Sequence, residues 1–188
     1  MNNLIRAFIA LKIDPEPAML KMIGDIKKCL SRERIKWVDE SSLHLTLKFL
    51  GDIPAGQVSG IRSVLTDICQ RTEKLKFSLK GIGYFKIKGN PSVLYVNIKC
   101  DEQLKRLAEE IDIRLEEIDI TREVRHFRPH LTIARIKDIS DKEVFYALCD
   151  RYRSTHLQSM SISNIILYQS ILKYDGPLYK NLAVIRLK

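Results

Sequence analysis

The stretch Leu43-His44-Leu45-Thr46-Leu47-Lys48-Phe49-Leu50-Gly51 sets the pattern from which the fold can be predicted. Apolar and polar residues alternate along it, as they do in a strand with one buried face. The alternation predicts a buried face of leucines and Phe49 and an opposite face of His44, Thr46 and Lys48. A helical pattern follows this predicted strand.

The same arrangement recurs 86 positions later, in the stretch His130-Leu131-Thr132-Ile133-Ala134-Arg135-Ile136, and again a helical pattern follows. Residues two apart on a strand share a face, so His130 and Thr132 are expected to point the same way while Leu131 and Ile133 anchor the other side. Because a repeated unit indicates repeated structure, we expect two similar lobes that face each other. No linker-like segment separates them, so residues 1–188 are predicted to form a single domain.

The remaining segments mix strand and helix patterns, with hairpin-type pairs among them. Helical stripes cover residues 18–30, 54–68, 101–118 and 141–152, and strand patterns cover 6–13, 35–38, 75–85, 92–100, 160–172 and 178–187. Such interleaving, together with turns such as Gly89-Asn90-Pro91, predicts an α+β fold with largely antiparallel sheets.

Composition restricts the partner and the compartment. The 32 basic and 23 acidic residues leave a net charge of +9, which favours an anionic partner, with nucleic acid first and an anionic membrane surface second. No apolar run approaches the roughly 20 residues of a membrane span, and the opening residues 1–11 have the pattern of a first strand rather than a signal peptide. The four cysteines form no C-x-x-C pair. Isolated reduced thiols are therefore expected, and with them a cytoplasmic protein.

Paired histidine and threonine residues point to acid–base chemistry on a phosphate ester. One neutral imidazole can take a proton while a charged one gives a proton. The hydroxyls of Thr46 and Thr132 can donate hydrogen bonds to anionic oxygens, and Arg135 can supply positive charge. Further basic residues surround the second motif, namely Arg122, Arg125, Arg128 and Lys137. Such a site needs no metal.

Each of these features also has a purely structural interpretation. A histidine on a half-buried strand is often a hydrogen-bonded packing residue, and basic clusters often form solvated surface. His126 and His130 have the spacing of a zinc pair, but Pro129 between them argues against a shared helical face. His156 is expected at the surface. Aromatic residues that could stack on bases, although packing is the simpler role, are Trp37, Phe49, Phe85 and Tyr168.

The chain resembles the two-histidine (2H) phosphoesterases, and among them the LigT-like RNA 2',3'-cyclic phosphodiesterases, long called 2'-5' RNA ligases. Both H-x-T-x motifs carry the resemblance, in the contexts Leu43–Gly51 and Phe127–Arg135. It extends over essentially the whole chain through the segments Arg6–Leu11, Ile35–Val38, Gly81–Phe85, Val93–Val96, Leu167–Ser170 and Tyr179–Leu187. His126 and the lysine-rich loop 86–90 depart from the family pattern, outside the two motifs.

This resemblance implies two pseudo-symmetric lobes around a basic central cleft, with the helices outside. It implies hydrolysis of an RNA terminal 2',3'-cyclic phosphate to a 2'-phosphomonoester, with tRNA halves among the candidate substrates and a monomeric protein. His44 would be the proton donor and His130 the proton acceptor, while Thr46, Thr132 and Arg135 would hold the phosphate. A weak, ATP-independent 2'-5' ligation in reverse is also implied.

Two alternatives remain open at this point. The chain could be a non-catalytic module that binds RNA or nucleotides through a basic cleft, which predicts salt-sensitive RNA affinity without turnover. It could also use the same chemistry on another substrate, such as ADP-ribose 1'',2''-cyclic phosphate or a 2'-5' linked oligonucleotide.

Overall fold

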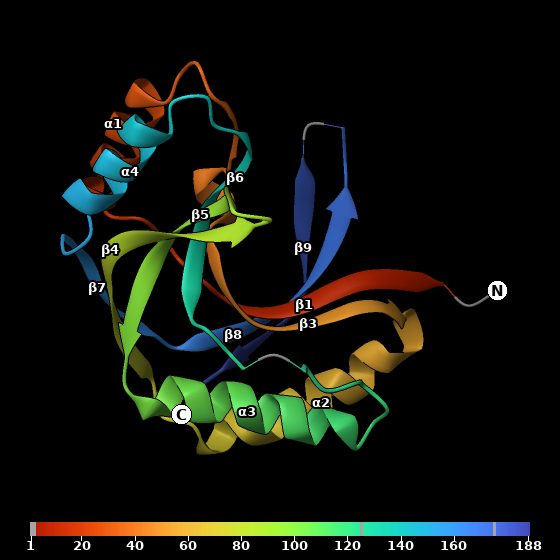
Figure 1. The fold of residues 1–188 in the computed structure, drawn as a ribbon. Coiled ribbons are helices and arrows are strands. Elements are labelled where there is room, and N and C mark those ends of the chain that lie inside the picture. Colours follow the sequence, from red (N-terminus) through yellow and green to blue (C-terminus); the bar gives the residue numbers. More distant parts are fainter. Residues whose placement is uncertain (1–2, 125, 175) are drawn as a thin grey trace.

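A computed structural model describes residues 3–124, 126–174 and 176–188 of the chain, and Figure 1 shows its fold. The helices are α1 (Pro17–Cys29), α2 (Val58–Arg71), α3 (Glu102–Glu116) and α4 (Lys142–Arg151). The strands are β1 (Leu4–Lys12), β2 (Arg34–Trp37), β3 (His44–Pro54), β4 (Leu75–Ile87), β5 (Asn90–Cys100), β6 (His130–Asp138), β7 (His156–Ile162), β8 (Asn164–Leu172) and β9 (Pro177–Arg186). The predicted α+β class is confirmed.

The strands form two antiparallel sheets. The first sheet has the order β3-β1-β8-β9, and the second sheet has the order β2-β6-β5-β4-β7. His44 begins β3 in the first sheet, and His130 begins β6 in the second. The two motifs of the sequence repeat therefore belong to different sheets, as the prediction of two lobes requires.

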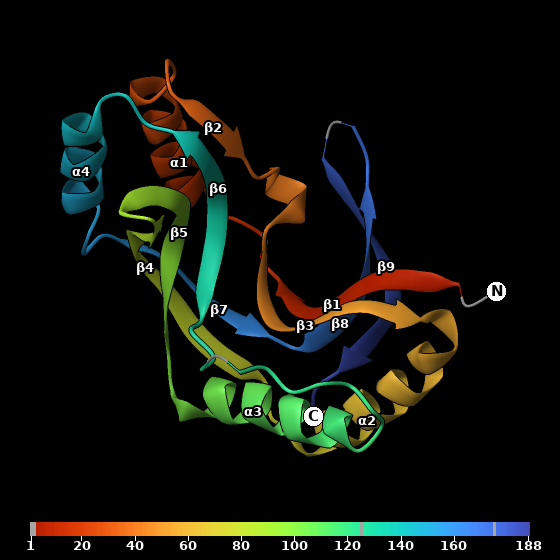
Figure 2. The same ribbon diagram turned by 45° about the vertical axis from the view of Figure 1, so that its right-hand side comes forward.

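The repeat is visible in the order of elements. The segment β1-α1-β3-α2 corresponds to β5-α3-β6-α4, with β2 added as an edge strand beside β6. The first helix of each repeat crosses to the other lobe, since α1 contacts β7 of the second sheet and α3 contacts β3 of the first. Consequently α1 lies beside α4 and α2 lies beside α3, each pair outside the sheets (Figures 1 and 2).

Because of this crossing, we expect the lobes to unfold together. One continuous cluster of buried side chains extends through both sheets and contains residues of all four helices. Neither lobe can expose its own core without exposing the other's. Urea denaturation followed by both circular dichroism and Trp37 fluorescence should give one coincident transition. Two separated transitions would contradict the prediction that residues 1–188 form a single domain.

The prediction of one continuous strand pattern over residues 160–172 is wrong, because two strands of different sheets occupy this segment. The chain ends β7 at Ile162 in the second sheet and begins β8 at Asn164 in the first. Ser163 lies between them, and its carbonyl accepts a hydrogen bond from the Leu187 backbone N–H at 2.8 Å. One residue suffices for the change of sheet, so no run of turn residues marks it.

The alternation predicted for β3 breaks after Leu47. Ile9 of β1 pairs with Lys48 and Ala10 pairs with Thr46, which leaves Leu47 as the extra residue of a β-bulge. Beyond the bulge the two faces exchange. Lys48 is buried, with 2% of its surface exposed, while Phe49 is 61% exposed. The predicted positions of Lys48 on the polar face and Phe49 on the buried face are therefore wrong.

Candidate active site

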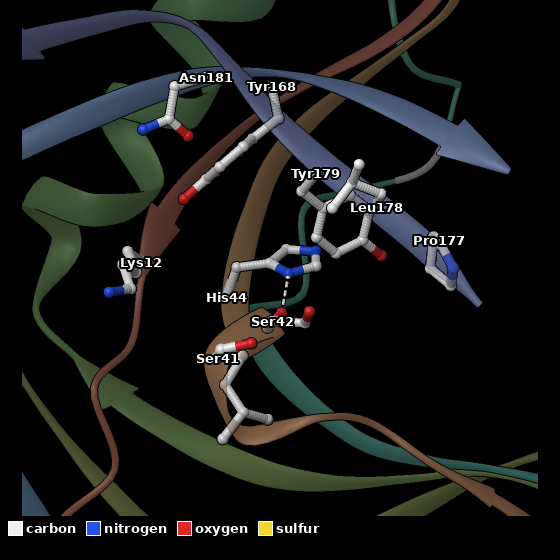
Figure 3. Close-up of a pocket in the computed structure, with 10 residues that line it drawn as sticks. Lys12, Ser41, Ser42, His44, Tyr168, Pro177, Leu178, Tyr179 and Asn181 are labelled. Atoms are coloured by element: carbon white, nitrogen blue, oxygen red, sulfur yellow. Dashed lines mark hydrogen bonds between the residues drawn. The ribbon is translucent and has the colours of Figure 1, made fainter. Parts of the chain in front are cut away.

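His44 is held by its neighbours in the chain at the edge of a pocket. Its Nδ1 lies 2.7 Å from the carbonyl oxygen of Ser42 (Figure 3). Since a carbonyl oxygen only accepts hydrogen bonds, Nδ1 carries a proton and donates it. The other ring nitrogen, Nε2, is thus left without a proton in the neutral ring and can accept one.

Aromatic rings from the other three strands of the first sheet enclose His44. The Phe8 ring on β1 lies 4.9 Å from the imidazole, and the Tyr179 ring on β9 meets it edge-on at 5.1 Å. Tyr168 on β8 stacks on Phe8 at 5.1 Å. The aromatic contacts fix the orientation of the imidazole and exclude water from one side of it.

His130 has an equivalent environment in the second sheet. Its Nδ1 lies 2.7 Å from the carbonyl oxygen of Arg128, again two residues earlier. The Phe85 ring on β4 meets the imidazole edge-on at 5.0 Å, and the Tyr95 ring on β5 lies 5.5 Å away. The two histidines thus have the same tautomer and the same kind of aromatic support, as a two-fold repeat of structure requires.

The structure brings both histidines to one place. Strands β3 and β6 contact each other although they belong to different sheets. Burial lowers the pKa of His44 below its ordinary value of 6.5, and the positive charges of Arg135 and His130 lower it further. Burial outweighs the hydrogen bond to Ser42, which acts in the opposite direction and raises the pKa. His44, His130 and Arg135 therefore lie within electrostatic reach of one another.

A second bulge brings Arg135 onto the face of His130. Residues five apart on a regular strand lie on opposite faces. In β6, however, Thr132 pairs with Tyr95 and Ala134 with the preceding Leu94, so Ile133 is an extra residue. Beyond Ile133 the faces exchange, as they do in β3, and Arg135 joins the face of His130 and Thr132. The equivalent position in β3 is Phe49. The two halves of the repeat therefore differ here, with a guanidinium on β6 and an exposed aromatic ring on β3.

The other predicted site residues have mixed positions. Thr46 and Thr132 are half-buried, each two residues after its histidine on β3 or β6. Among the basic residues, Arg128 lies near enough to Tyr95 to oppose the rise that burial causes in the pKa of that tyrosine. Arg122 turns away to pair with Asp112 at 3.4 Å. His126 and Lys137 are exposed, and Arg125 lies outside the described residues.

His156 is exposed, as predicted, and its Nε2 lies 3.3 Å from Ser159 Oγ on β7. All four cysteines, Cys29, Cys69, Cys100 and Cys149, are free thiols, which confirms the prediction of unpaired cysteines. None of the helices in the described part of the chain has the length and hydropathy of a membrane span.

A pocket of about 270 Å³ opens beside His44 (Figure 3). Strand β9 forms one wall, and the side chains of Lys12, Ser41, Tyr168, Tyr179 and Asn181 contribute polar groups to the lining. Sequence reasoning missed this pocket, and it missed Phe8, Tyr95 and Tyr179 as neighbours of the histidines. Phe85 and Tyr168, which the sequence marks as stacking or packing residues, both lie in the aromatic surroundings of the histidines. For all of these rings, the sequence shows only that an aromatic residue lies on a predicted strand, and it does not show that the ring contacts a histidine.

The comparisons with known proteins agree with this geometry. The family described as LigT like Phosphoesterase matches residues 11–95 and 98–179. An RNA 2',3'-cyclic phosphodiesterase of Archaeoglobus fulgidus is 29% identical over 184 residues, which cover 96% of this chain and 99% of that protein. An RNA 2',3'-cyclic phosphodiesterase of Thermotoga maritima is 31% identical over 178 residues, covering 94% of this chain and 92% of that protein.

Solved structures show the same fold. A crystal structure from Thermus thermophilus has a TM-score of 0.79 and 26% identity, covering 97% of this chain and 98% of that one. Apo LigT of E. coli has a TM-score of 0.75 at 19% identity, covering 98% of both chains, and shows the likeness of fold alone. Because the family match includes both histidine motifs and most of the sequence, this chain belongs to the LigT-like phosphoesterase family.

Proposed function

We propose that this chain hydrolyses the terminal 2',3'-cyclic phosphate of RNA to a 2'-phosphomonoester, with His44 and His130 as the acid–base pair and without metal or cofactor. The observation that carries the proposal is the matched pair of imidazoles, each fixed through Nδ1 with Nε2 left to exchange protons. The names of the relatives from Archaeoglobus and Thermotoga supply the substrate class. The net charge of +9 suits RNA.

In this mechanism Nε2 of His130 takes a proton from a water molecule as its oxygen attacks the phosphorus atom. The bond between phosphorus and the 3' oxygen breaks, and protonated His44 donates its proton to that oxygen. Thr46, Thr132 and Arg135 bind the phosphoryl oxygens, where hydrogen bonds and positive charge stabilise the transition state. The 2' oxygen keeps the phosphate, and the two histidines end with exchanged protonation states.

The test is a short RNA with a 2',3'-cyclic phosphate end, incubated with the protein in excess EDTA. The product should carry its phosphate on the 2' oxygen, and it should disappear in both His44→Ala and His130→Ala. A 3'-phosphate would keep the enzyme but exchange the two histidine roles. Bound RNA without product would identify a binding module. If only ADP-ribose 1'',2''-cyclic phosphate or a 2'-5' linked oligonucleotide is turned over, that compound would take the place of RNA with a cyclic-phosphate end as the proposed substrate.

Substrate binding should raise the pKa of His44. In the free protein burial and the charges of Arg135 and His130 hold this pKa below 6.5. A bound phosphate adds negative charge beside them and favours the protonated ring, which is the form a proton donor needs. An NMR titration with and without a nucleoside 2'-monophosphate would measure the shift, with exposed His156 as internal control. An unchanged pKa of His44 would contradict its role as donor to a bound phosphate ester.

Gly83→Ala should lower activity more than stability. A Cβ at this position would lie 2.7 Å from the Tyr95 ring, which packs against Phe85 and His130. The ring can move aside, so the free energy of unfolding should change by less than about 1 kcal/mol. The displaced Tyr95 ring would also move His130. Since a small misplacement of a catalytic group slows a reaction steeply, we expect kcat to fall about tenfold. Gly56→Ala, with open space around its Cβ position, is the matched control.

Finer features of the proposal concern the biological setting. We expect tRNA halves among the substrates, a monomer in solution, and a cytoplasmic location, to which the four free thiols are suited. A weak ATP-independent 2'-5' ligation would use the same two histidines. The 5'-hydroxyl of a second RNA would attack the cyclic phosphate in place of water, and the bond between phosphorus and the 3' oxygen would break. Incubation with tRNA halves and sedimentation at several protein concentrations would test the substrate and the monomer separately.

A further inference from the structure

The β8–β9 hairpin extends beyond the first sheet as an arm, defined here as residues 170–174 and 176–180 (Figure 2). Two backbone hydrogen bonds close its turn, from Lys173 N–H to the Gly176 carbonyl at 3.0 Å and from Gly176 N–H to the Lys173 carbonyl at 3.2 Å. Near this turn Leu172 is 74% exposed and Tyr174 is fully exposed. Exposed apolar side chains of this size at one place indicate a binding surface.

One face of the arm continues the wall of the His44 pocket. Residues that pair directly across antiparallel strands share a face, and the pairs here are Tyr168 with Asn181, Ser170 with Tyr179, and Leu172 with Pro177. Tyr168, Tyr179, Asn181 and Pro177 line the pocket. Leu172 therefore lies on the same face, four residues or about 13 Å further along the strand than Tyr168. An aromatic and apolar track leads from the pocket to the tip.

Positive charge accompanies this track. Over residues 170–180 the sequence has two lysines, Lys173 and Lys180, against one acidic residue, Asp175. Across from the tip lies Lys36 of β2, whose Nζ would be 3.6 Å from a Cβ built on Gly176. Lys36 pairs in register with Arg135 on β6. Cationic groups thus lie beside the arm from its tip to the phosphate-binding side of the site.

We propose that the arm binds the single-stranded RNA that precedes the cyclic-phosphate end, with bases on Leu172 and Tyr174 and backbone phosphates on Lys173 and Lys36. Rings for stacking beside a line of positive charge are the features by which proteins hold single strands without reading their sequence. The inference rests on the proposed function and extends it to the length of the substrate. The protein distinguishes an RNA chain from a mononucleotide through the arm, while the chemistry at His44 and His130 is common to both.

The test compares two substrates in the same assay. We expect Tyr174→Ala to raise KM about tenfold for a decamer RNA with a 2',3'-cyclic phosphate end. Neither kcat for the decamer nor kcat/KM for adenosine 2',3'-cyclic phosphate should change by more than about twofold. Lys173→Ala should act in the same direction and lose its effect at high salt. Ile113→Ala and Lys21→Ala, exposed residues on α3 and α1, are the matched controls.

A binding measurement separates failure of this proposal from failure of the proposed function. Fluorescence anisotropy with the same decamer carrying a 2'-phosphate needs no turnover, and Tyr174→Ala should weaken its affinity about tenfold. Equal affinity for the wild type and the variant would overturn the proposal even if hydrolysis is observed. Equal losses on decamer and mononucleotide would also overturn it, because the arm would then only shape the pocket. So would a dimer that Tyr174→Ala dissociates while RNA affinity stays unchanged.

Discussion

Replacement of His130 by alanine is expected to lower the rate of cyclic-phosphate hydrolysis about a thousandfold, within the range that a positioned acid or base supplies. His44→Ala should cost a similar factor, since the two imidazoles act in one step. RNA affinity should stay nearly intact, because the phosphate contacts proposed for Thr46, Thr132 and Arg135 would remain. Single-turnover rates and anisotropy binding curves, measured on the same preparations, separate these two effects.

The chain offers its own controls for this experiment. His126 and His156 are exposed, and neither belongs to a matched histidine–threonine pair. Alanine at either position should change the rate less than twofold. A comparable loss in all four variants would point to a general effect on the fold. Variants of His44 and His130 that lose RNA affinity but keep their rate would show that the imidazoles bind the substrate and do not transfer protons.

The second large effect is expected at Lys48. Its ammonium forms a buried ion pair with Asp112 of α3 and donates a hydrogen bond to the Thr121 carbonyl at 2.8 Å. Asp112 also accepts the Glu123 backbone N–H at 3.0 Å. Lys48→Met leaves a largely buried carboxylate whose remaining cationic partner is the more exposed Arg122 at 3.4 Å, a change that costs about 3 kcal/mol of unfolding free energy. Urea denaturation measures the cost, with exposed Lys76→Met on β4 as the control.

A double variant tests whether the charge left behind causes the loss. Asp112→Asn removes that charge, so Lys48→Met/Asp112→Asn should be more stable than the sum of the two single effects predicts. Burial raises the pKa of Asp112, but the hydrogen bond and charge of Lys48, with hydrogen bonds from Glu123 and Arg122, together outweigh it and leave the pKa below 3.8. The stabilisation from Asp112 is therefore complete above that pH and is lost as the pH falls through the lowered pKa. Additive effects in the double variant would assign the cost to lost packing instead.

Strand and helix patterns predicted the class of fold well because most elements bury only one face. The errors in the predicted fold arose at single residues. The bulge at Leu47 reversed the faces of Lys48 and Phe49, and periodicity over nine residues contains no sign of such an insertion. The break at Ser163 separates strands that each carry their own pattern, so the run of residues 160–172 looked continuous. Bulges and sheet changes depend on pairing partners that are distant in the sequence.

The candidate site could be predicted where its residues lie close together on the same strand. His44 with Thr46 and His130 with Thr132 are pairs of this kind. The sequence indicated Arg135 only as a source of positive charge, and its role at the phosphate came from the resemblance, because its face depends on the bulge at Ile133. The rings of Phe8, Tyr95 and Tyr179 reach the histidines from other strands, and the packing of those strands decides which rings do so. The alternation of residues along a strand predicts which face a side chain occupies, but it does not predict which side chains of other strands will contact it.

The strand order of the first sheet also determines when this protein can become active during synthesis. β1 contains residues 4–12, and β8, its partner, contains residues 164–172. A nascent chain therefore has one edge of β1 unpaired until β8, which begins at residue 164, has been translated. His44 lacks Tyr168 and Tyr179 for the same period. We therefore expect hydrolysis to begin only after the β8–β9 hairpin has left the ribosome. A polypeptide that stalls between residues 138 and 164 would carry both histidine motifs without a finished pocket.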